Sequence, residues 1–171
     1  MTKGNYNAMS RIIVVLATVL SLAFTPLAAQ DFQKGVAAYQ AGDYATALQE
    51  WTPLAEAGYG NAQNNLGLMN YYGIGVPQDY AEAVKWYRLV ADQGDADAQG
   101  SLGRMYSDGQ GVPQDYAEAV RWYRLAADQG DARAQTLLGY MYQNGLGVLQ
   151  DNVTAHMWFN IGAANGQELG G

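Results

Sequence analysis

Small and apolar residues return at helical spacing along most of the chain. One face of the segment 61–72 carries Ala62, Leu66, Gly67 and Met69. Residues three or four positions apart share a helix face, so the segment is predicted to form a helix, here called helix A. Gly73 and Gly75 then interrupt the pattern, and Pro77 prevents the helix from continuing.

A second helix, helix B, is predicted to begin after Asp79, whose side chain can cap the free backbone amides. Glu82, three residues on, can reach back to complete a capping box. The apolar face of helix B then carries Tyr80, Ala83, Val84, Tyr87 and Ala91. Gly94 is expected to end this helix, and Gly130 and Gly166 to end its later copies.

The whole pattern recurs every 36 residues. The recurring positions are Gly67, Gly103 and Gly139; Met69, Met105 and Met141; Gly75, Gly111 and Gly147; Asp79, Asp115 and Asp151; and Trp86, Trp122 and Trp158. A fixed period in the range of about 20 to 50 residues is typical of a solenoid. Sparse Val and Ile beyond the first third also favour packed helices over sheets. The predicted fold class is therefore all-α, an α/α solenoid of helical hairpins.

A shorter copy precedes these units, from Phe32 to Gly58. Asp43 lies 36 residues before Asp79, but Gly35 lies only 32 before Gly67, so the missing residues come from the loop between the helices. The predicted organisation is a signal peptide at 1–29, a short hairpin at 30–60, and repeats at 61–96, 97–132 and 133–171, the last with a short C-terminal tail.

The stretch "AQGSLGRMYSDGQGVPQDYAEAVRWYRLAADQGDA" resembles the Sel-one-like repeat family, a relative of the tetratricopeptide repeat. The similarity extends over nearly all of the chain that follows the signal segment. The short hairpin at 30–60 resembles an ordinary tetratricopeptide unit more closely. The resemblance implies a right-handed α/α superhelix that serves as a protein-binding scaffold, and it implies no reaction. Some relatives, rich in cysteine, are discussed as binders of bacterial wall fragments or β-lactam-like molecules.

Charge and composition narrow the function classes. The formal net charge of −7 disfavours nucleic acids and anionic membranes as partners. The chain has no cysteine, and therefore no disulfide, thiolate nucleophile or cysteine metal site. The only histidine, His156, stands where Val84 and Val120 stand in the other copies, and it is expected to be a half-buried packing residue. We expect no metal site and no cofactor.

The pair Asp79 and Glu82 admits two interpretations. They are either a catalytic carboxylate pair or a helix cap. Because the pair returns as Asp115 and Glu118, we favour the cap, since positions repeated in every hairpin are needed for stacking. The sequence "GIGV" lacks the context of a phosphate-binding loop, and no G-x-S-x-G motif occurs. The protein is therefore predicted not to be an enzyme.

Positions of helix A that differ between the copies are the candidates for binding. They share one stripe, away from the leucine-glycine face. The predicted groove residues are Asn61, Asn64, Leu68, Tyr71, Tyr72, Asp97, Arg104, Ser107, Asp108, Arg133, Thr136, Tyr140, Gln143 and Asn144. In tetratricopeptide-like folds this stripe lines the concave surface. The alternative is that these positions are solvated and vary freely.

The last helix B departs from the others. Met157 replaces Lys85 and Arg121, and Asn160 replaces Arg88 and Arg124. We expect Met157, Trp158 and Phe159 to be exposed, because the chain stops where the next helix A should begin. Either the natural chain is longer, or this end pairs with a partner or a second copy. In the alternative, the terminal helix turns its aromatic residues inward.

Three functions from different classes follow. The first is an exported scaffold or adaptor in the bacterial envelope that holds a protein or peptide partner along helix A. The second is an envelope module that binds cell-wall fragments or another small ligand. The third is a self-association module that acts through the C-terminal hairpin.

The first residues have the layout of a secretory signal peptide. Lys3 and Arg11 precede an uncharged apolar run at 12–24, and Ala28 and Ala29 follow. The run is short of the roughly 20 residues that a spanning helix needs, which favours a cleaved signal over an uncleaved anchor. Cleavage after Ala29 leaves seven basic against sixteen acidic residues, a net charge of −9, in a periplasmic or secreted protein.

Export predicts a mature N-terminus at Gln30 or within one or two residues of it. Intact-mass spectrometry of the envelope fraction measures this directly. Recovery of the uncut Met1 form in the membrane pellet would instead identify an anchor.

Overall fold

The structure, a computed structural model, describes residues 26–168, and side chains from 28 to 166. All regular secondary structure in this range is helical. The bounds are α2 (Pro26–Gln40), α3 (Tyr44–Glu56), α4 (Gly60–Tyr72), α5 (Tyr80–Ala91), α6 (Ala96–Asp108), α7 (Tyr116–Asp128), α8 (Ala132–Asn144) and α9 (Asn152–Glu168). The predicted apolar run of the signal peptide lies outside these residues, and the predicted cleavage bond falls within α2.

The helices belong to two compact units, one that ends at Tyr59 and one that begins at Gly60. The first unit is the hairpin α2–α3. A Cβ atom built on Gly35 would lie 2.3 Å from Nε1 of Trp51, so only glycine lets the helices approach at this point. Asp43 caps α3 by accepting a hydrogen bond from the Thr46 amide at 3.1 Å. The expected tight turn is therefore present.

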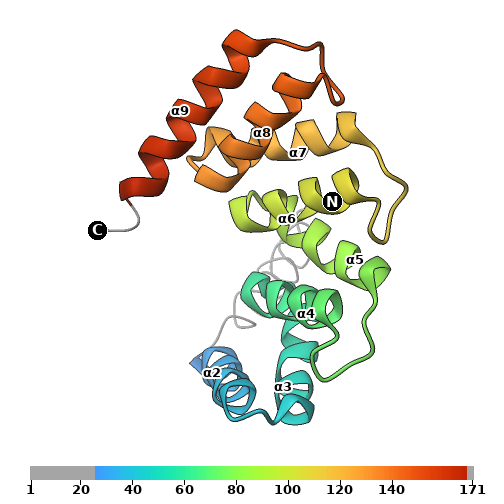
Figure 1. Cartoon of the computed structure of the whole chain (residues 1–171). Coiled ribbons are helices and arrows are strands. Elements are labelled where there is room, and N and C mark those ends of the chain that lie inside the picture. Colours follow the sequence, from blue (N-terminus) through green and yellow to red (C-terminus); the bar gives the residue numbers. More distant parts are fainter. Residues whose placement is uncertain (1–25, 169–171) are drawn as a thin grey trace, which may run out of the picture. The chain divides into compact units, whose positions relative to one another are not determined.

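The second unit contains three hairpins, α4–α5, α6–α7 and α8–α9, each packed beside the next (Figure 1). Helices α4, α6 and α8 are the helices A, and α5, α7 and α9 are the helices B. The predicted face of α4 is buried, as are the matching residues of α6 and α8. The all-α solenoid expected from the 36-residue period is confirmed.

One glycine in each hairpin lies against an aromatic ring. A Cβ atom at Gly103 would lie 2.6 Å from the ring of Tyr123, and Gly67 and Gly139 meet Tyr87 and Phe159 in the same way. These distances are shorter than any ordinary carbon contact. The recurring leucine-glycine pair thus brings helix A close to helix B.

The loop glycines have two different tasks. Gly109 ends α6 in the left-handed region, with φ of 68°. Gly111, with φ of 72°, also lies against the preceding hairpin, because a Cβ atom there would be 2.3 Å from the Tyr80 carbonyl oxygen. Gly147 meets the Tyr116 backbone at the same distance. The first loop glycine therefore ends a helix, and the second lies at a contact between hairpins.

One of the two hydrogen bonds predicted to cap helix B is present. The Asp79 side chain accepts a hydrogen bond from the Glu82 amide at 2.9 Å. The second hydrogen bond of a capping box, from the Asp79 amide to the Glu82 carboxylate, is not formed, so the prediction of a capping box was wrong. The Asp79 amide instead donates to the Asn70 carbonyl at 2.9 Å, which leaves the Glu82 carboxylate to pair with Lys85 at 2.6 Å.

Buried glutamines link the hairpins. Gln99 is only 4% exposed, and its Nε2 donates to the Ala91 carbonyl of the preceding helix B at 3.1 Å. Its Oε1 accepts a hydrogen bond from Gln129 of its own hairpin at 2.8 Å. Gln135 repeats the arrangement with the Ala127 carbonyl and Asn165, both at 2.9 Å. Because their polar groups are bonded, these side chains can lie in the interior.

Gly166 does not end the last helix as expected. Gly94 and Gly130 adopt φ values of 99° and 94°, and each precedes an aspartate that caps the next helix A. No such aspartate follows Gly166, so α9 continues to Glu168.

Two glycines of α6 are predicted to respond oppositely to the same change. Gly103→Ala should lower the free energy of unfolding by about 1–3 kcal/mol, because the methyl group overpacks against Tyr123. Gly100→Ala should raise it by about 1 kcal/mol, because alanine favours the helix and nothing lies within 4 Å of a Cβ atom there. Urea unfolding measures both, and equal destabilisation by the two changes would contradict the packing.

Stability is predicted to fall above about pH 10, the ordinary pKa of tyrosine. Burial raises the pKa of Tyr87 and Tyr123 well above that value, so these side chains keep their protons in the folded state longer than in the unfolded state. Their contribution is complete at lower pH and is lost as pH rises. Replacement of both by Phe should flatten the decline of the melting temperature between about pH 9.5 and 11. Tyr140→Phe, at an exposed position, is the control.

Candidate interaction groove

A groove with a volume of about 470 Å³ runs across the three helices A of the second unit. Its lining is Asn64, Asn65, Leu68, Tyr71 and Tyr72 from α4, Tyr87 from α5, Asp97, Gly100, Ser101 and Arg104 from α6, and Asp131, Arg133, Ala134 and Leu137 at and after the start of α8. All of these residues lie in one compact unit. The three hairpins together therefore form this surface.

The α4 side of the groove is aromatic and carries no charge. Tyr71 packs edge-on against Tyr72 and Tyr80, with ring centres 4.8 and 5.2 Å apart. Its hydroxyl donates to Oε1 of Gln110 at 2.9 Å. Burial raises the pKa of Tyr71, and the positive charge of Arg104 opposes this rise. Tyr71 is thus held in place, whereas Tyr72 is 59% exposed.

The α6 side carries Arg104. Its Nε lies 3.5 Å from Oδ2 of Asp108, one turn further along the same helix. The pKa of Arg104 is raised, first by Tyr71 and then by the hydrogen bond to Asp108. The side chain is largely exposed, so this ion pair contributes little to stability.

The α8 side carries Arg133 and Leu137, both exposed. Asp131 caps α8 by accepting a hydrogen bond from the Ala134 amide. Arg133 has no ion-pair partner within residues 28–166.

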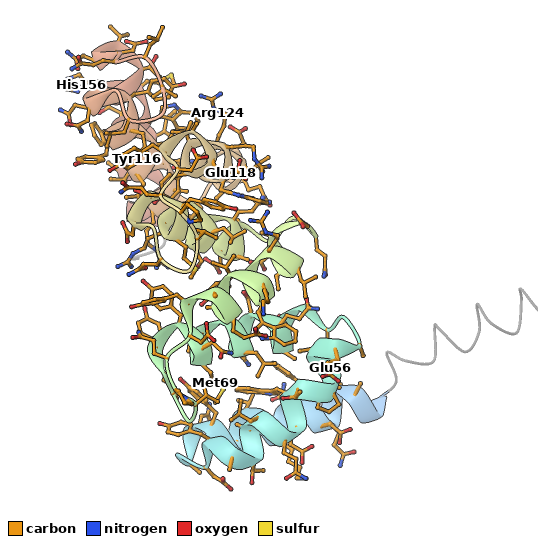
Figure 2. All side chains as sticks on the ribbon, turned by 90° about the vertical axis from the view of Figure 1, so that its right-hand side faces the viewer. Glu56, Met69, Tyr116, Glu118, Arg124 and His156 are labelled. Atoms are coloured by element: carbon orange, nitrogen blue, oxygen red, sulfur yellow. The ribbon has the colours of Figure 1, made fainter. Side chains whose placement is uncertain are left out.

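The other cations of the second unit are engaged elsewhere. Lys85 and Arg121 pair with Glu82 and Glu118, both at 2.6 Å. Arg88 and Arg124 each reach the next hairpin, where they donate to the hydroxyl groups of Tyr106 and Tyr142, and Figure 2 labels Arg124. Among the described basic residues of this unit, Arg133 therefore stands out as unpaired.

Half of the predicted groove residues line the groove. These are Asn64, Leu68, Tyr71, Tyr72, Asp97, Arg104 and Arg133. The structure places the remainder outside the lining: Asn61, Ser107, Asp108, Thr136, Tyr140, Gln143 and Asn144. Thr136 and Asn144 bond carbonyl groups of their own helix, Ala132 at 2.9 Å and Tyr140 at 2.8 Å, which turns their polar groups away from a ligand.

One stripe of residues in the groove lining was not predicted from the sequence. Asn65, Ser101 and Leu137 lie 36 residues apart, and they also differ between the copies. The same comparison of copies marks this position as variable, so the signal was present. Tyr87 could not be found in this way, because it belongs to the repeated core.

No group of three or more potential metal ligands is found in the described part of the chain. His156 is exposed on α9 (Figure 2), so its assignment as a half-buried packing residue was wrong. Val84 and Val120 are buried at the matching positions because a following hairpin covers them. Within the described residues, no helix has the length and apolar character to cross a membrane.

The last helix exposes different residues from those expected. Trp158 packs partly buried against the core of α7 and α8, and Phe159 lies against Gly139. Their expected exposure was wrong, because the aromatic side chains fill the inside of the hairpin. Met157 is 46% exposed, as expected, with Val153 and Ile161 one turn before and after it. Self-association through this end stays a prediction.

Comparison with known proteins supports the repeat assignment. The model of the Sel1 repeat, the family called Sel-one-like above, matches residues 60–95, 96–131 and 132–167. These repeats begin one residue before the boundaries predicted from the sequence. No curated protein matches the chain.

Two crystal structures show the same architecture. One is c5321, a protective antigen present in uropathogenic Escherichia coli strains that displays an SLR fold, with 40% identity and a TM-score of 0.78 over 81% of this chain and 31% of that one. The other is a Sel1 repeat protein from Oxalobacter formigenes, with 34% identity and a TM-score of 0.70 over 78% of this chain and 55% of that one. The chain thus spans about a third and about half of these relatives. With three matched repeats over more than half of its length, the chain belongs to the Sel1 repeat family.

Proposed function

We propose that the protein is an exported, non-catalytic scaffold that holds a protein or peptide partner in the groove across α4, α6 and α8. Sel1 repeat proteins are generally scaffolds for protein–protein interaction. The observation that carries the proposal is the groove itself, which exposes residues that vary between the hairpins.

The division between repeated and variable residues supports a binding role. Gly103 and Gln99 recur in every hairpin of the second unit and lie at contacts between helices. The variable residues Leu68, Arg104 and Leu137 are exposed on the groove. A surface that combines Tyr, Arg and Leu offers the aromatic and charged anchors that protein interfaces use most.

Export and the absence of catalysis are parts of this proposal. The basic start, the apolar run and the small residues before Gln30 support export. Asp79 and Asp115 act as helix caps, which gives these repeated carboxylates a structural role. A cell-wall fragment is the second candidate ligand, because a volume of about 470 Å³ falls within the range of small-ligand sites.

Site-specific photocrosslinking in envelope extract tests the main proposal. The crosslinking amino acid benzoyl-phenylalanine replaces Tyr72 in the groove or Leu89 on α5 outside it. The two side chains have similar exposure, 59% and 47%, so the comparison is matched. We expect Tyr72 to give a discrete protein adduct, identified by mass spectrometry, and Leu89 to give none. Adducts from Leu89 alone would mean that another face binds the partner.

A titration with soluble muropeptides distinguishes a cell-wall fragment from a protein or peptide as the ligand. If cell-wall fragments are the ligands, they should protect Tyr72 from crosslinking and raise the melting temperature in proportion to their concentration. The scaffold proposal predicts neither effect.

A further inference from the structure

Gly100 lies in the interior of α6, and no packing contact explains why this position is a glycine. Gly67, Gly103, Gly139 and Gly162 each have a neighbouring atom within 2.6–2.9 Å of the position that a Cβ atom would take. A Cβ atom on Gly100 would meet nothing within 4 Å. Glycine destabilises a helix interior relative to alanine, and no contact within the described residues compensates for this.

The location of Gly100 in the groove suggests why this position has no side chain. It lies in the middle of the groove lining, between residues from α4 and α8. The matching positions in the other hairpins are Asn64 and Thr136. Because it lacks a side chain, Gly100 keeps the centre of the groove open to something that must approach the α6 backbone closely.

The charges at this surface provide a second, independent observation. Among the described residues of the unit, Arg133 is the cation with neither an ion pair nor a tyrosine hydroxyl as partner, in a chain whose net charge is −7. Arg104, on the α6 side, has only a long and exposed ion pair with Asp108. Two acidic residues also line the groove, but Asp131 is engaged in capping α8, which leaves Asp97 as the free carboxylate.

We propose, on the basis of the proposed function, that the occupant of the groove is an extended peptide segment that carries a carboxylate. Its backbone crosses α6 over Gly100. Its carboxylate pairs with Arg133, with Arg104 nearby, since guanidinium and carboxylate groups form strong, bidentate hydrogen bonds. An apolar side chain of the same segment packs against Leu68 and Tyr72 on the uncharged side.

Selection of random 12-residue peptides displayed on phage, with the purified full chain as the target, tests this proposal. We expect the selected peptides to be enriched in Asp or Glu beside an apolar residue. Fluorescence polarisation then measures the dissociation constant of a selected peptide and of the same peptide with its acid changed to the amide. Loss of the acid should weaken binding about tenfold, as should Arg133→Gln, because each removes the same charge-assisted pair.

Variants of matched size define the place of binding. Gly100→Phe fills the open centre of the groove and should abolish binding. Ala164→Phe, at an exposed position on α9, is the control. Circular dichroism confirms that both variants fold. Asp97→Asn should leave the affinity unchanged or raise it.

The outcomes separate this inference from the function on which it rests. Binding that is abolished by Gly100→Phe but insensitive to the acid and to Arg133→Gln would overturn the carboxylate and leave the groove as the binding site. Enrichment of Lys or Arg, with weakening by Asp97→Asn, would do the same. If no peptide is selected, this inference fails and a folded protein remains the partner under the proposed function. If folded Gly100→Phe binds as well as the control, the groove is not the binding site and both proposals fail.

Discussion

The close approach of two helices at a glycine is the contact on which each hairpin depends. Gly35, Gly67, Gly103 and Gly139 all lie where a single methyl group would overlap an aromatic ring from the second helix of the same hairpin. The aromatic partners Trp51, Tyr87 and Tyr123 are almost fully buried. Because cores tolerate extra volume poorly, this contact fixes the spacing of the two helices and the depth at which the aromatic ring lies. The exposed side of helix A is then free to vary.

Contacts between hairpins use polar groups as well as apolar surface. Gln99 joins the Ala91 carbonyl behind it to Gln129 beside it, and Gln135 repeats this one hairpin later. On another side, Arg88 and Arg124 reach tyrosine hydroxyls of the following hairpin. Hydrogen bonds with specific directions allow one register between neighbours, whereas apolar surface alone would tolerate sliding.

The scaffold could be predicted further than the groove, for a physical reason. Repeated residues such as Gly103 report a contact that every hairpin must make, so the 36-residue period revealed the helices and their buried faces. The tasks of Gly111 and Gln99 depend on atoms of the neighbouring hairpin, which a pattern within one unit does not show. The groove requires three helices in register. Variability therefore identified Arg104 and Arg133 but also Tyr140 and Gln143, which lie outside the lining.

The last helix shows how the same positions change when their partners differ. Val120 is buried and Arg124 bonds Tyr142 in the next hairpin, whereas the matching His156 and Asn160 are exposed on a face that no described helix covers. Polar residues suit such a face, as expected for the outer side of a stack of repeats. The aromatic Trp158 and Phe159 remain inside, because they belong to the hairpin's own core. Each position of helix B therefore follows the neighbour that it faces. Arg133, on helix A, has no ion-pair partner among the described residues, and the carboxylate inferred above would supply one.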